Sequence, residues 1–138
     1  MANIIKLGNR PKTFKEMNVP VNLPNGDQGV IPVTFKYFPK EEFGAWQDKA
    51  MAKGKAAAQK ESQGGAEEQE KEFSWESIYR QSSELLIENL LDVIASWGLE
   101  EALSRQSLQQ LEHECGAAVL PAMLESFTRA CREGRLGN

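Results

Sequence analysis

The sequence predicts an α+β fold, in which an N-terminal β-hairpin or small antiparallel sheet packs with a mostly α-helical body of about four helices. Apolar residues alternate with polar ones between residues 17 and 37, and after residue 73 they recur at spacings of three and four. The 138 residues are enough for one domain. We expect residues 1–138 to form a single domain, with a hairpin plus first helix over 1–55, a flexible linker over 56–72 and a helical part over 73–134.

Two alternating segments separated by turn-forming residues predict the hairpin. Residues 24–29, Pro-Asn-Gly-Asp-Gln-Gly, are typical of a turn. Because side chains alternate across a strand, eight apolar positions share one face: Met17, Val19, Val21, Leu23, Ile31, Val33, Phe35 and Tyr37. Pro20 and Pro32 donate no hydrogen bond, so each must face an unpaired edge or begin or interrupt pairing. We assign Val33 and Phe35 to the structural core.

A first helix is predicted over about residues 39–55. Pro39 suits its first turn, and Phe43 and Trp46 follow at helical spacing. The next stretch, 56–72, contains no large apolar residue, so burial cannot offset the entropy lost on ordering. We predict a flexible linker there, although its Ala and Glu residues would permit partial helix.

The segment after residue 73 carries the strongest helical pattern. Ser74 is expected to cap a helix of about six turns, and Gly98 stands where glycines end helices. Between them, apolar side chains recur at three and four: Ile78, Tyr79, Leu86, Leu90, Val93, Ile94 and Trp97. We assign Leu86, Leu90 and Trp97 to the core.

Two shorter helices complete the predicted body. Ser104 and Ser107 are alternative caps for a helix that ends near Gly116. The last helix carries an apolar stripe with helical spacing. We assign Leu120 and Phe127, on that stripe, to the core.

Charge is divided unevenly along the chain. Residues 1–60 carry a net charge of +5, and residues 61–138 carry −9. The basic residues are scattered singly, without the aromatic or glycine-rich elements of a nucleic-acid footprint, so we expect no nucleic-acid partner. The opposite charges would instead attract the two halves to one another or to a neighbouring copy, which keeps a homo-oligomer open.

The sequence lacks the patterns of a membrane or exported protein. No stretch approaches the roughly 20 apolar residues of a spanning helix, and the N-terminus does not resemble a signal peptide. We expect no membrane partner and a location in the bacterial host cytoplasm. Cys115 and Cys131 match neither a zinc nor a CxxC spacing, and we expect both to be thiols packed as small apolar side chains.

Motifs of catalysis and cofactor binding are missing. The sequence contains no GxxxxGK[ST], HExxH, GxGxxG or CxxC pattern, and no nucleophile elbow surrounds a serine. The run Glu112-His113-Glu114-Cys115 offers four ligand types, but successive residues on a helix point about 100° apart and cannot converge on one ion. We expect no enzymatic activity, no catalytic residues, no metal and no cofactor.

One combination of packing residues is characteristic. A hairpin ending in Val33-Thr-Phe-Lys-Tyr37 is followed by a Lys- and Ala-rich helix, then Trp97-Gly98, Leu120-Pro121 before the last helix, and a terminal Gly137-Asn138. Over most of the chain outside 56–72, this order resembles the tail assembly chaperones of long-tailed bacteriophages and their prophage remnants.

The resemblance implies a non-enzymatic role in virion assembly. Such a protein binds the tape-measure protein and keeps it soluble until tail-tube subunits polymerise. In related phages a ribosomal frameshift extends part of the product, and the extension recruits the tail-tube protein, which is the second expected partner. The alternative is a small helical adaptor or transcription-associated regulator of a prophage, but the last helix has no basic residue before Arg129 to contact phosphates.

Phe38, Phe43 and Trp46 are the candidate partner-binding residues. Their helix has too narrow an apolar stripe to need all three for its own burial, and aromatic side chains suit exchangeable contacts with apolar helices. The other interpretation is that they cap the core of the hairpin, as aromatic residues at helical spacing usually do. The sequence leaves both interpretations open.

Overall fold

The computed structural model describes residues 4–67 and 74–133, which form a three-stranded antiparallel sheet and helices in an α+β arrangement. This confirms the predicted fold class. The elements follow one another along the chain as β1 (Met17–Asn22), β2 (Gln28–Phe35), α1 (Lys40–Glu67), α2 (Trp75–Val93), β3 (Ile94–Trp97), α3 (Arg105–Cys115) and α4 (Val119–Glu133).

The predicted hairpin is present as β1 and β2. The strands pair antiparallel, with Val19 opposite Ile31, and the turn between them is closed by a hydrogen bond from the Leu23 amide to the Asp27 carbonyl. Val19, Val33 and Phe35 are fully buried. The alternating pattern therefore places one face of the hairpin against the core.

Both hairpin prolines point their ring nitrogens away from the β1–β2 ladder. The carbonyl oxygen of Pro32 accepts a hydrogen bond from the Gly98 amide at 2.8 Å, so this residue faces away from β1. Pairs in an antiparallel ladder alternate between bonded and non-bonded, and Pro20 lies two positions beyond Asn18, which is the partner of Pro32. Pro20 consequently faces the open edge of β1, as expected for a residue without an N–H group.

The long helix predicted from Ser74 to Trp97 is wrong at its C-terminal end. The cap is confirmed, because the Ser74 hydroxyl accepts a hydrogen bond from the Ser77 amide at 3.2 Å. The helix ends at Val93, however, and the next four residues form β3, in which Trp97 pairs with Val33 of β2. Residues 94–97 could continue the helix or pair with the free edge of β2. Pairing prevails, because the β-branched Ile94 and the aromatic Trp97 suit a strand.

Trp97 and Gly98 consequently have other roles than those predicted. Trp97 lies on a short strand and is only half-buried against the core, and its indole nitrogen donates to the Glu101 carbonyl at 2.7 Å. Gly98 does not end a helix; it continues the contact between β3 and β2 through Pro32.

The predicted linker is partly helical. Helix α1 continues from Lys40 to Glu67, so residues 56–67 extend the first helix instead of following it. The rest of the predicted linker, 68–72, lies outside the described residues. The flexibility assigned to this segment stays a prediction.

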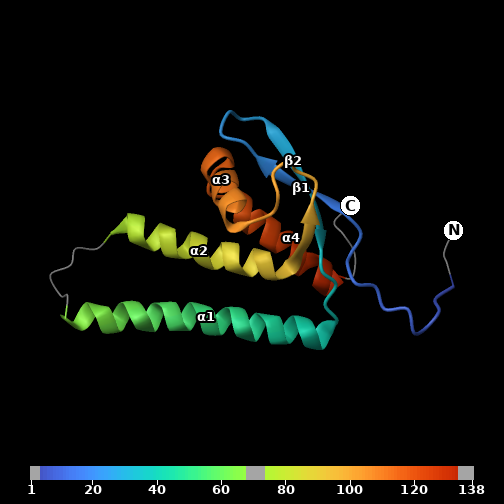
Figure 1. Cartoon of the computed structure of the whole chain (residues 1–138), viewed down its shortest axis with the longest axis horizontal. Coiled ribbons are helices and arrows are strands. Elements are labelled where there is room, and N and C mark those ends of the chain that lie inside the picture. The colour runs from blue at the N-terminus through green and yellow to red at the C-terminus, as the bar shows by residue number, and fades with distance from the viewer. Residues whose placement is uncertain (1–3, 68–73, 134–138) are drawn as a thin grey trace.

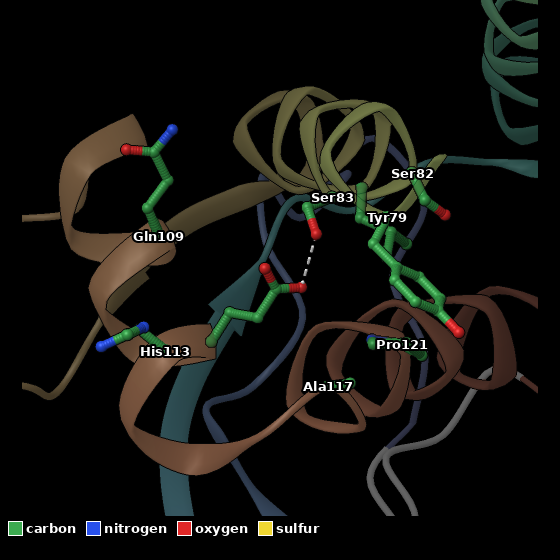
Figure 2. Close-up of a pocket in the computed structure, with 9 residues that line it drawn as sticks. Tyr79, Ser82, Ser83, Gln109, His113, Ala117 and Pro121 are labelled. Atoms are coloured by element: carbon green, nitrogen blue, oxygen red, sulfur yellow. Dashed lines mark hydrogen bonds between the residues drawn. The ribbon is translucent and has the colours of Figure 1, made fainter. Parts of the chain in front are cut away.

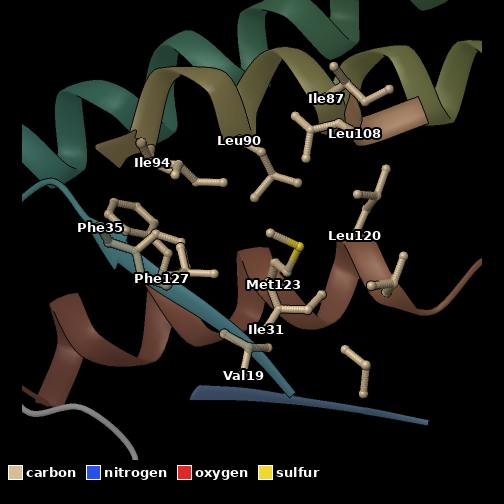
Figure 3. Packing of buried hydrophobic residues seen from close by; sticks show 14 of the residues in the cluster. Val19, Ile31, Phe35, Ile87, Leu90, Ile94, Leu108, Leu120, Met123 and Phe127 are labelled. Carbon is tan, nitrogen blue, oxygen red and sulfur yellow. The ribbon is translucent and has the colours of Figure 1, made fainter. Parts of the chain in front are cut away.

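The elements form layers over one face of the sheet. Helix α4 contacts both β1 and α2, so it lies between the sheet and α2 (Figures 1 and 3). Helix α1 runs antiparallel to α2 on the outer side (Figure 1), and the two are joined by an ion pair of 3.1 Å between Lys53 Nζ and Asp92 Oδ2.

The buried core gathers side chains from the sheet and from α2, α3 and α4 (Figure 3), and Phe43 of α1 joins it. Of the residues assigned to it from the sequence, Val33, Phe35, Leu90, Leu120 and Phe127 are fully buried. On α2 the buried stripe is centred on Ile87, Leu90 and Val93. Leu86 lies at the side of this stripe and is half-buried.

The predicted cap and end of α3 are confirmed. Ser104 caps α3, and its hydroxyl and the Ser107 hydroxyl each accept a hydrogen bond from the other residue's backbone amide. This reciprocal arrangement satisfies two amides that the first turn of a helix leaves unpaired. Gly116 ends α3 with a φ of 102°, a conformation that favours glycine.

Candidate functional site

The three candidate partner-binding aromatics gather around one buried ring. Phe127 of α4 lies 5.6 Å from Phe38, 5.9 Å from Phe43 and 5.2 Å from Trp46 between ring centroids. Phe35 of β2 completes the group at 5.5 Å. We call these five residues the Phe127 cluster.

Packing in the Phe127 cluster favours the core interpretation of these aromatics. Phe43 is only 8% exposed, and Phe38 and Trp46 are half-buried against the core. The indole nitrogen of Trp46 is buried and has no hydrogen-bond partner among the described residues. These side chains attach the start of α1 to α4, which leaves little of their area for a partner.

A groove of about 590 Å³ opens between α2, α3 and the start of α4 (Figure 2). Tyr79 extends from α2 toward Pro121 of α4 along one wall. On the other side, the Ser83 hydroxyl donates to Glu112 Oε2 of α3 at 2.9 Å. The remaining lining comes from Ser82, Leu86, Gln109, His113 and Ala117.

Two exposed aromatic rings stand beside this groove. Trp75 and Tyr79, one turn apart at the start of α2, stack with centroids 5.7 Å apart and an interplanar angle of 24°. They are 61% and 64% exposed. Tyr79 fits the apolar spacing expected of the helix, but this end of α2 extends beyond the sheet, so the ring is not covered by it (Figure 1).

The family of the chain follows from a comparison of its sequence with models of known protein families. A family model described as phage tail assembly chaperone matches residues 1–138, which is the entire chain. This chain belongs to the phage tail assembly chaperone family. Comparison of the chaperone with curated proteins and with solved structures found no match. The resemblance drawn from the sequence is therefore confirmed, and the family's role in assembly implies partners among tail proteins.

The acidic run on α3 does not form a metal site in the described part of the chaperone. Among residues 4–67 and 74–133, no three His, Cys, Asp or Glu side chains converge as ligands. Glu112 is hydrogen-bonded to Ser83, and Glu114 accepts from the Gln110 side chain on the same helix. These groups thus serve contacts between and within helices.

No described helix of the chaperone combines the length and apolar character needed to cross a membrane.

Cys131 of the chaperone is expected to react slowly in the folded state. Burial raises the pKa of its thiol to about 11, and only the thiolate is nucleophilic. Iodoacetamide at pH 8, followed by mass spectrometry, should label Cys131 much more slowly in the folded chain than in urea. Because the pKa of Cys131 is raised in the folded state, the slowing of its labelling relative to urea is greatest below the ordinary thiol pKa. The slowing is lost as the pH rises through about 11. Equal labelling rates in buffer and urea would contradict the burial.

Proposed function

We propose that this chaperone binds the tape-measure protein and keeps it soluble in the host cytoplasm until the tail tube polymerises, without catalysing a reaction. The observation that carries the proposal is the family match over all 138 residues. The tail-tube protein is the second proposed partner, engaged through a frameshift-extended form of the chain.

We further infer that the Trp75–Tyr79 ring pair contacts the client. Apolar helices are recognised by exposed apolar side chains at helical spacing, and these two rings are exposed one turn apart. Large rigid aromatic side chains also bury much area for little loss of side-chain entropy. The predicted trio Phe38, Phe43 and Trp46 supports this role less well, because its members pack around Phe127.

Replacing both rings should separate binding from folding. In the double variant Trp75→Ser/Tyr79→Ser, we expect recovery of a co-expressed tape-measure segment in the soluble fraction to fall by about tenfold or more, since exposed aromatic anchors dominate such contacts. Thermal unfolding should change little, because the rings are mostly exposed. The measurements are a pull-down from the soluble fraction and a melt of each variant.

The matched control is Val30→Ser, because Val30 is also large, apolar and exposed but lies on β2. It should leave client binding unchanged. Wild-type chain that fails to keep any tape-measure segment soluble would refute the proposed function. Wild-type activity that survives loss of both rings would refute only their assignment.

A further inference from the structure

Residues 4–9, the first that the structure describes, carry exposed apolar side chains. Ile4, Ile5 and Leu7 are 91%, 85% and 95% exposed, although large aliphatic side chains are normally among the most buried in a protein. Three such residues within four positions, interrupted by Lys6, concentrate exposed apolar surface in one short segment, which is typical of an interaction site. We call residues 4–9 the N-terminal arm.

The body of the molecule holds the base of the arm but leaves its tip free. The guanidinium of Arg10 forms an ion pair of 2.8 Å with Glu42 of α1 and lies 5.8 Å from the centre of the Tyr37 ring. The Tyr37 amide then donates to the Lys12 carbonyl. From this attachment the arm runs outward, away from the helices and the sheet (Figure 1). The apolar side chains of the arm are therefore accessible to another molecule.

The lining of the groove between α2, α3 and α4 is chemically complementary to the arm. Apolar surface in the groove comes from Leu86, Ala117 and Pro121, and the Tyr79 ring forms one of its walls. Glu112 lies in the same lining and supplies a negative charge beside that surface. A short peptide with aliphatic side chains and one positive charge matches these walls.

Charge favours a second copy of this chain as the source of that peptide. Lys6 is the one charged residue of the arm, and the adjoining stretch up to residue 15 adds Arg10, which is paired with Glu42, and two lysines without any Asp or Glu; α2 and α3 together contain six Asp or Glu and two Arg. Opposite net charges on two patches promote encounter and fix orientation. Within one chain the arm leaves the fold at the end opposite to the start of α2, which lines the groove (Figure 1). The arm would therefore reach the groove of another copy and not its own.

We propose that the N-terminal arm of one copy docks in the α2–α3–α4 groove of a second copy. Ile5 and Leu7 enter the apolar part of the groove, and Lys6 faces Glu112. Arm and groove are different surfaces of one chain, so the contact is heterologous and each copy can both give and receive an arm. The inference concerns self-association and is tested on the purified chain without any client.

Sedimentation of the purified chain over a wide concentration range tests the contact. The wild-type mass should rise with concentration, and the triple variant Ile4→Ser/Ile5→Ser/Leu7→Ser should associate at least about tenfold more weakly. Ala117→Trp should do the same from the other side, because Ala117 is an exposed residue of the groove lining and its replacement fills the groove. Ala118→Trp is the matched control, since Ala118 is exposed but does not line the groove.

A labelled peptide of residues 4–12 identifies the receptor directly. Fluorescence anisotropy should show it binding the triple Ser variant, whose own arm cannot compete, and failing to bind the same variant with Ala117→Trp added. A wild-type chain that stays monomeric throughout would overturn the proposal. Peptide binding that is insensitive to Ala117→Trp would overturn it as well, because the arm would then dock elsewhere.

Discussion

Phe127→Ala is expected to lower the free energy of unfolding by about 3–5 kcal/mol, the range for removing a large aromatic side chain from a core. Phe127 is fully buried and is the residue on which the four other rings of its cluster converge. Its loss would leave a cavity between β2, α1 and α4. The four remaining rings of the cluster would lose dispersion contacts at once.

Urea denaturation followed by circular dichroism measures this change. The control is Tyr79→Ala, which also truncates an aromatic residue but at an exposed position, and should alter stability by no more than about 0.5 kcal/mol. Similar unfolding midpoints for the two variants would show that the Phe127 cluster does not anchor α1 to the body.

Gly98→Ala should destabilise the chain by about 1–3 kcal/mol, the range for forcing extra volume into a packed site. A Cβ at residue 98 would lie 2.9 Å from the Cβ of Pro32 and 3.0 Å from its Cγ. The proline ring is rigid and belongs to β2, so relief requires β3 to move away. That movement would stretch the hydrogen bond from the Gly98 amide to the Pro32 carbonyl.

Gly54→Ala supplies a control of opposite sign. Gly54 lies inside α1, and a Cβ there would meet nothing within 4 Å. Alanine is favoured over glycine within helices by about 0.8–1.0 kcal/mol, so this variant should be more stable than the wild type. Thermal melts compare the stability of the two variants. A Gly98→Ala variant as stable as Gly54→Ala would show that residue 98, at the end of β3, does not pack against Pro32 in solution.

The hairpin was predictable because its pattern is local. Alternation over residues 17–37 follows from the geometry of a strand, and the buried faces of β1 and β2 match it residue by residue. The caps of α2 and α3 were predictable for the same reason. A serine side chain reaches an amide three residues away, which involves no other part of the fold.

The end of α2 was not predictable in this way. Val93, Ile94 and Trp97 fit the spacing of a helix, yet they also suit a strand, and the choice depends on the free edge of β2 sixty residues earlier. The bond from the Lys36 amide to the Val93 carbonyl fixes the point of change. Periodicity within one segment contains no information about that edge.

The candidate surfaces show the same division. The sequence identified Phe38, Phe43 and Trp46 as a group, but whether they face a partner or the core depended on Phe127, about eighty residues away. The groove and the Trp75–Tyr79 ring pair were missed, because both depend on where α2 extends beyond the elements that cover it. The sequence carried no signal for the ring pair, because Ile78 and Tyr79 continue the apolar spacing of the helix, and only the structure shows that its fully buried residues begin at Ile87.

The sequence by itself determined the α+β class, the hairpin, the helix starts and the family. Each of these depends on spacings within one segment or on a pattern that spans the whole chain. Only the tertiary structure decided that β3 replaces the last turn of a helix, that the aromatic residues of the Phe127 cluster pack against one another, and that the N-terminal arm and the groove are exposed. Burial is a property of pairs of segments brought together on folding, so the same apolar residue is core or surface according to what lies opposite it.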